Sequence, residues 1–172
     1  MFLKFLKNFI LKRKLKNSLL NVNNSSSADK ITTVGILTDE SYFKDREGLV
    51  QELVDNGIRP ENIKILIYKD KIKKNEEFAH PVFNLNTINW EGIVTKEEVK
   101  EFMGMNFDML ISYYDIEKAA LLLVTQQTKA NFKVGFSTID KRLNNFMINT
   151  IAENYNVFSN ELFRYLKILN KI

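Results

Sequence analysis

The hydrophobic and polar pattern between residues 107 and 137 predicts a strand, a helix and a second strand. The segment FDMLISYY is short, apolar and aromatic, as a fully buried strand is. The segment DIEKAALLLVTQQTKA is long, lacks Gly and Pro, and opens with Asp115, a residue type that favours the N-cap of a helix. In NFKVGFS, Phe132, Val134 and Phe136 alternate with other residues as they do in a strand. Such a unit places its two strands side by side and parallel.

The chain before this unit alternates in the same way. Residues 31–37 (ITTVGIL) predict a strand, and the helix that follows should end near Asn56, because Gly57 suits a left-handed C-terminal cap. A strand at 63–68 comes next. The short apolar segment VFNL then precedes a helix that starts at Thr95, where TKEE has the pattern of a capping box.

Two elements are predicted after residue 137. The segment FMINTI at 146–151 is a short strand, and only a polar turn separates it from the strand before, so we expect it to be antiparallel. The last helix should begin at Ser159, with Phe158 and Phe163 packed as a hydrophobic staple around that cap. It continues to the end of the chain.

Together these elements predict an α/β fold. The sheet should be open and mostly parallel, with about five strands and helices on both faces, as in Rossmann-like and flavodoxin-like proteins. The 172 residues include 13 Phe, and 45% are hydrophobic, which is enough for a substantial core. We assign residues 31–172 to this single domain.

The first 22 residues have a different pattern. Over the first ten, bulky apolar residues fall on one side of a helix at 3.6 residues per turn, and Lys4, Lys7 and Asn8 fall on the other. Arg13 then interrupts the apolar stripe. The stripe consists of Phe2, Leu3, Phe5, Leu6, Phe9 and Ile10.

Charge separates this helix from the domain. Six of the 25 basic residues lie in residues 1–22, which hold no acid, whereas the remainder has 19 basic and 21 acidic residues. The six are Lys4, Lys7, Lys12, Arg13, Lys14 and Lys16. The net charge of +4 is therefore weak support for a domain that binds nucleic acid. The polar segment 23–30 is predicted to be a linker.

Three interpretations of the basic helix remain open. It could lie on an anionic membrane, with its apolar groups in the acyl boundary and its lysines at the headgroups. It could pack on its own domain or on a second subunit. It could instead be a basic arm on RNA. Its apolar run is far shorter than the roughly 20 residues that span a bilayer, and lysines interrupt the continuous apolar region of a secretory signal.

Several chemistries lack their residues or motifs. There is no Cys and only one His, His80, so thiolate sites and multi-histidine metal sites within one chain are excluded. The chain has no Gly-x-Gly-x-x-Gly after its first strand, no GxxxxGK[ST] loop and no GxSxG elbow. We therefore expect no cofactor and no metal, and no residue is assigned a catalytic role.

A ligand crevice is predicted at the carboxyl ends of the parallel strands, where open α/β sheets bind their ligands. The polar side chains expected there are Asp39, Glu40, Ser41, Tyr113, Tyr114, Asp115, Ser137, Asp140 and Arg142. Most also suit a structural role: Asp39 or Ser41 could cap the next helix, and Asp140 could form a turn.

The order of these signals is familiar. The segments FDMLISYY, KAALLLVTQQTKANFKVGF, DKRLNNFMI and NVFSNELFRYLKILNKI, with the NWEG turn and the basic N-terminus, resemble a family of small uncharacterised bacterial α/β proteins. The resemblance covers nearly the whole chain. It implies a bacterial protein that faces the cytoplasm, with no established activity, and it assigns no functional residues.

The leading hypothesis is a non-catalytic binding or scaffold protein. The basic helix would hold it peripherally on an anionic membrane, with Phe2, Phe5 and Phe9 and the six basic residues in contact with lipid or with a partner. The first alternative is a protein or enzyme that binds a small molecule or nucleotide in the predicted crevice. The second is association with RNA or the ribosome through the basic arm.

Overall fold

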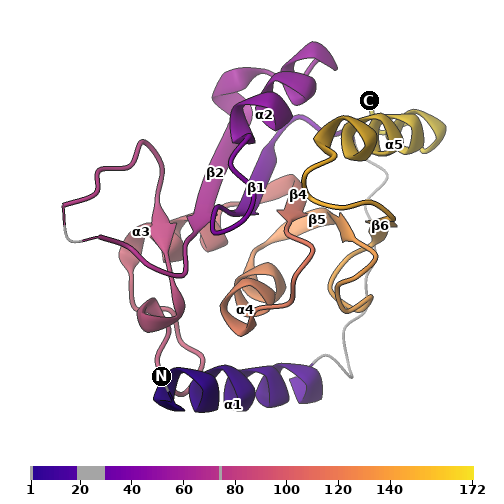
Figure 1. Cartoon of the computed structure of the whole chain (residues 1–172). Helices are drawn as coiled ribbons and strands as arrows, with labels where there is room; N and C mark the ends of the chain where they lie inside the picture. The colour runs from indigo at the N-terminus through magenta and orange to yellow at the C-terminus, as the bar shows by residue number, and fades with distance from the viewer. Residues whose placement is uncertain (1, 19–29, 74) are drawn as a thin grey trace.

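The computed structural model describes residues 2–18, 30–73 and 75–172 (Figure 1). The predicted linker at 23–30 lies outside this range except for Lys30. The helices are α1 (Phe2–Ser18), α2 (Arg46–Asp55), α3 (Glu97–Gly104), α4 (Ala119–Gln127) and α5 (Tyr155–Ile168). The strands are β1 (Val34–Asp39), β2 (Ile63–Tyr68), β3 (Val82–Phe83), β4 (Phe107–Tyr113), β5 (Ala130–Phe136) and β6 (Phe146–Ile148). Short 3-10 turns at Pro60–Asn62 and Leu85–Thr87 complete the described elements.

The six strands form one open sheet in the order β3-β2-β1-β4-β5-β6, and every neighbouring pair is parallel. The predicted α/β fold class is confirmed, with six strands where about five were expected. Strand order reverses between β1 and β4, so the switch point of the sheet lies between the end of β1 and the end of β4.

The predicted antiparallel direction of the last strand is wrong. β6 pairs in parallel with β5, and Val134 faces Phe146. The connection at 137–145 is shorter than most crossovers. It nevertheless returns the chain to the start of the sheet through two turns, and Ile139 and Leu143 are buried along this path. Both side chains belong to the hydrophobic core.

Helices cover both faces of the sheet (Figure 1). α2 and α5 pack together on one face, and α1 and α4 pack together on the other. Beneath α5, the ring of Phe158 lies 5.0 Å from that of Tyr113 and 4.9 Å from that of Phe136. Tyr113 and Phe136 come from β4 and β5, so this aromatic cluster fixes the last helix on the sheet.

Three predicted helix starts are wrong. α4 begins at Ala119, and the carboxylate of Asp115 instead accepts a hydrogen bond from the Ala152 N–H. α3 has no side-chain cap, because its N-cap residue is Lys96, and the Thr95 hydroxyl instead donates to the Thr87 carbonyl. α5 begins at Tyr155, so Ser159 lies buried inside the helix and caps nothing. The predicted cap at Gly57 is confirmed by its positive φ of 97°.

A single carboxylate oxygen braces the entry into the central strands. Asp108 Oδ2 accepts hydrogen bonds from the backbone N–H and the hydroxyl of both Thr32 and Thr33, at 2.7–2.9 Å. Burial raises the pKa of Asp108, but these four donors outweigh that effect and hold the pKa below its usual value of 3.8. The carboxylate thereby ties the segment before β1 to β4.

We expect Asp108→Ala to lower the free energy of unfolding by about 1–2 kcal/mol at neutral pH, because it leaves four donors without their charged acceptor. A lowered folded-state pKa contributes stability above the unfolded value, and this contribution is lost as the pH falls. The difference between variant and wild type should therefore shrink below about pH 4. Urea unfolding at several pH values measures it. Glu101→Ala, at an exposed carboxylate, is the control.

Candidate functional site

α1 is docked on the domain through its second half. Leu11 and Leu15 are buried, and α1 lies along α4 on one face of the sheet (Figure 1). The sequence pattern placed neither leucine on the apolar stripe of the helix. α1 is therefore held by a side of the helix that was not predicted to make contacts.

Hydrogen bonds fix α1 at both ends of this contact. Asn8 Oδ1 accepts the N–H of Ala119 at 3.0 Å, so a side chain of α1 caps the first turn of α4. At the other end, Gln126 Nε2 donates to the Ser18 hydroxyl at 2.8 Å. Between them Lys12 Nζ donates to the Glu117 carbonyl at 2.8 Å.

The predicted apolar stripe of α1 faces away from the domain. Phe2 is 73% exposed, Phe5 71% and Phe9 56%. At 100° per residue Phe2 and Phe9 lie on the side of the helix away from Leu11 and Leu15, and Phe5 lies at the edge of that side, where it also lines a pocket described below. We call this side the outer face of α1. It also carries the exposed residues Leu6, Arg13 and Lys16.

The other lysines of α1 lie nearer to the domain. Lys7 Nζ lies 5.8 Å from the centre of the Trp90 ring, and Lys14 Nζ donates to the Trp90 carbonyl at 3.4 Å. Lys4 lies at the edge of a pocket described below. The basic residues therefore surround the helix, while the phenylalanines are gathered on its outer face.

An ion cluster lies at the switch point of the sheet, where the crevice was predicted. Lys118, at the start of α4, places its Nζ 2.7 Å from Asp39 Oδ2 and 2.8 Å from Asp70 Oδ2. The Tyr68 hydroxyl donates to the second Asp70 oxygen at 2.9 Å. Burial raises the pKa of Asp70, but the hydrogen bonds from Lys118 and Tyr68 outweigh it and lower the pKa overall. Ser41 accepts from the Asp70 N–H at 3.0 Å.

The remaining crevice candidates are distributed among separate contacts. Tyr113 and Tyr114 are buried, and burial raises the pKa of both phenols. Their hydroxyls bond to the Ala152 carbonyl and the Thr125 hydroxyl at 2.7 Å. The others pair as follows: Glu40 with Arg46, Asp115 with the Ala152 N–H, Ser137 with Asn149, and Asp140 with Arg142. The structure thus brings Asp39 and Ser41 to one cluster and leaves the other candidates elsewhere.

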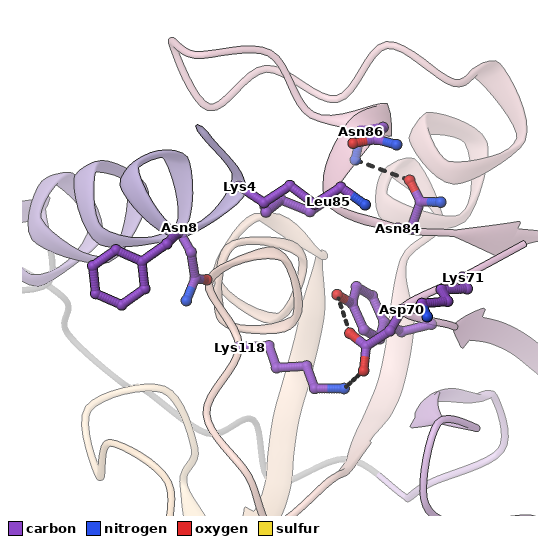
Figure 2. A pocket seen from close by; sticks show the side chains of 10 residues that line it. Lys4, Asn8, Asp70, Lys71, Asn84, Leu85, Asn86 and Lys118 are labelled. Atoms are coloured by element: carbon purple, nitrogen blue, oxygen red, sulfur yellow. Dashed lines mark hydrogen bonds and ion pairs between the residues drawn. The ribbon is translucent and has the colours of Figure 1, made fainter. Parts of the chain in front are cut away.

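A pocket of about 580 Å³ opens beside this cluster, between α1 and the carboxyl ends of β2 and β3 (Figure 2). α1 and the start of α4 contribute Lys4, Phe5, Asn8 and Lys118. The segments after β2 and β3 contribute Asp70, Lys71, Asn84, Leu85 and Asn86, and Tyr68 ends β2. We call this space the α1 pocket.

Sequence reasoning missed most of the residues that line the α1 pocket. Asp70, Lys71 and the asparagines at 84 and 86 were given no role. The signal that could have found them is their position directly after β2 and β3, at the ligand-binding edge of the sheet. The contribution of α1 had no signal, because nothing in the local pattern shows where this helix docks.

The strand order and the wholly parallel sheet define a doubly wound α/β protein with an additional N-terminal helix. The chain belongs to a family of unknown function, DUF6913, whose model matches residues 7–169. The predicted membership of an uncharacterised family is thereby confirmed. The searches found no match among curated proteins and no match among solved structures.

Proposed function

We propose that this protein is a non-catalytic binding or scaffold protein that associates peripherally with an anionic membrane through the outer face of α1. The observation that carries the proposal is the exposure of Phe2, Phe5 and Phe9 on a helix that is already docked by its other side. An acid-free helix with six basic residues complements an anionic surface. On this proposal the protein is cytoplasmic and lies on the inner membrane face.

The chemistry of the outer face fits an interfacial helix. Each phenylalanine that leaves water for the acyl boundary contributes about 1.5–3 kcal/mol. Each basic residue near anionic lipid contributes about 1 kcal/mol. Arg13 and Lys16, on the same side as the phenylalanines, would lie at the level of the headgroups. No helix in the described ranges is long and apolar enough to cross a bilayer.

Docking on the domain is compatible with membrane contact. Leu11 and Leu15 face α4, whereas Phe2 and Phe9 face outward, so α1 can contact the domain and the membrane at once. The domain would then lie on the membrane with α4 above α1, and the sheet would be held at a fixed distance from the lipid.

Co-sedimentation with vesicles of phosphatidylcholine and phosphatidylglycerol tests the proposal. We expect the full-length protein to sediment with them at low salt and less at high salt, since salt screens the basic residues. The double variant Phe2→Ser/Phe9→Ser keeps every charge and both docking leucines, and should bind about tenfold or more weakly. Ile168→Ser, at an exposed apolar residue of α5, should bind like wild type.

Failure of the full-length protein to sediment with these vesicles at low salt would refute the membrane proposal. Unchanged binding by the double variant would also refute the role of the outer face. If the protein instead binds RNA with a steep salt dependence, and the lysine variants of α1 lose that binding, the basic-arm alternative replaces it.

A further inference from the structure

The α1 pocket has the size and mixed lining of a small-molecule site. Its volume of about 580 Å³ lies within the range of roughly 300–1,000 Å³ that is usual for ligand pockets. Phe5, Tyr68 and Leu85 provide apolar wall, while lysines and asparagines provide polar groups. The pocket lies at the carboxyl edge of a parallel sheet, where this fold class binds its ligands.

Each acceptor oxygen of the lining carboxylate and of two lining asparagines already accepts a hydrogen bond from the protein. Asn8 Oδ1 accepts the Ala119 N–H at 3.0 Å, and Asn84 Oδ1 accepts the Asn86 N–H at 2.9 Å. The two oxygens of Asp70 accept from Tyr68 and Lys118 (Figure 2). Because a backbone N–H is always a donor, the oxygen of each amide must be the atom that faces it. The remaining amide nitrogens of Asn8 and Asn84 are therefore donors.

Two cations add to this excess of donors. Within the described part of the chain, the ammonium groups of Lys4 and Lys71 have no hydrogen-bond or ion-pair partner. Lys118 is different, because Asp39 and Asp70 already neutralise it. The α1 pocket thus offers two free ammonium groups and two amide N–H₂ groups, and its one carboxylate is occupied.

We propose that the α1 pocket binds an organic phosphate. Its phosphate oxygens, which only accept hydrogen bonds, would bind Lys4, Lys71 and the asparagine amides. Its organic part would lie against Phe5, Tyr68 and Leu85. The phosphate can belong to a soluble nucleotide or to the headgroup of a lipid, and both present the same acceptor chemistry.

This site couples ligand binding to the position of α1. Lys4, Phe5 and Asn8 belong to α1, whereas Lys71 and Asn84 belong to the sheet domain. A ligand that contacts both sides stabilises the docked helix, and by linkage the docked helix strengthens ligand binding. Hydrogen exchange of the α1 amides should therefore slow when the ligand is bound.

The test uses the full-length protein with three probes: ATP without metal, short-chain phosphatidic acid below its micelle concentration, and adenosine as a phosphate-free control. Thermal unfolding and hydrogen exchange of α1 are the two readouts. We expect ATP or the phosphatidic acid to raise the midpoint of unfolding and to protect α1, and adenosine to do neither. ATP alone would indicate a soluble ligand, and phosphatidic acid alone would indicate a lipid headgroup.

Substitutions of single lysines test whether the probe binds in the α1 pocket. Lys71→Gln lies outside α1 and should weaken the effective probe about tenfold or more, as should Lys4→Gln. Lys73→Gln, in the same loop but not in the lining, should bind like wild type. The proposal is overturned if neither phosphate probe shifts the midpoint, if adenosine binds as tightly as ATP, or if both pocket-lysine variants bind like wild type.

Discussion

Replacing Lys118 with alanine should lower the free energy of unfolding by about 3–5 kcal/mol, far more than the loss of a surface ion pair. Lys118 lies between Asp39 and Asp70, and its own side chain is only 14% exposed. The side chain of Asp39 is 5% exposed. Without the ammonium group this carboxylate stays buried with no opposite charge beside it, and an uncompensated buried charge is costly.

Chemical denaturation of the variant measures this loss, and a second substitution shows its origin. Asp39→Asn removes the stranded charge, so the double variant Lys118→Ala/Asp39→Asn should be less destabilised than the sum of the two single variants. Lys129→Ala, at an exposed lysine just after α4, should change stability by less than about 0.5 kcal/mol. A loss below about 1 kcal/mol for Lys118→Ala would show that the cluster is solvated and weak.

Replacing Leu11 with alanine should detach α1 while the sheet stays folded. Leu11 is 1% exposed, and a buried Leu→Ala change costs about 2–5 kcal/mol. α1 contacts the domain mainly through α4. The substitution should therefore weaken the docking of α1 and leave the stability of the sheet unchanged. We expect the α1 amides to exchange roughly a hundredfold faster, with the strands of the sheet unchanged.

Leu3→Ala is the matched control for this experiment. It makes the same chemical change on the same helix, at a residue that is 66% exposed. Its exchange rates should equal those of wild type. If the α1 amides of Leu11→Ala exchanged no faster than those of wild type, the docked position of α1 would be wrong. If exchange rose equally across all strands, the independence of α1 from the sheet would be wrong.

The order of helices and strands could be read from the sequence because each of the longer strands is a short segment rich in apolar residues, either in a run or in alternation. β4 and the apolar centre of α4 are examples, since their burial leaves few polar positions. Gly57 could be read as a cap because few other residues tolerate its positive φ. These features depend on local sequence, and local sequence was sufficient to predict them.

The predictions that were wrong concern features that depend on contacts between residues far apart in the sequence. Asp115 has the right residue type for a cap, but its carboxylate is taken by Ala152, and Asn8 caps α4 from another helix. The parallel direction of β6 accompanies the burial of Ile139 and Leu143 in the connection before it, which a local reading took for a polar turn. The partners of Lys118 lie far away in the sequence, so neither the ion cluster nor the α1 pocket had a local signal.

The cap that Asn8 places on α4 also has a consequence for the order of synthesis. The residues joined by that hydrogen bond are 111 positions apart, and α1 is made first. At about 5–20 residues per second, α1 leaves the ribosome on the order of ten seconds before its docking helix exists. During that interval α4 has not been synthesised, so the leucines of α1 have no docking partner and are exposed together with its phenylalanines. On the membrane proposal, a nascent chain that meets an anionic lipid surface in this period would be localised before its sheet is complete, and folding of the domain would follow membrane binding.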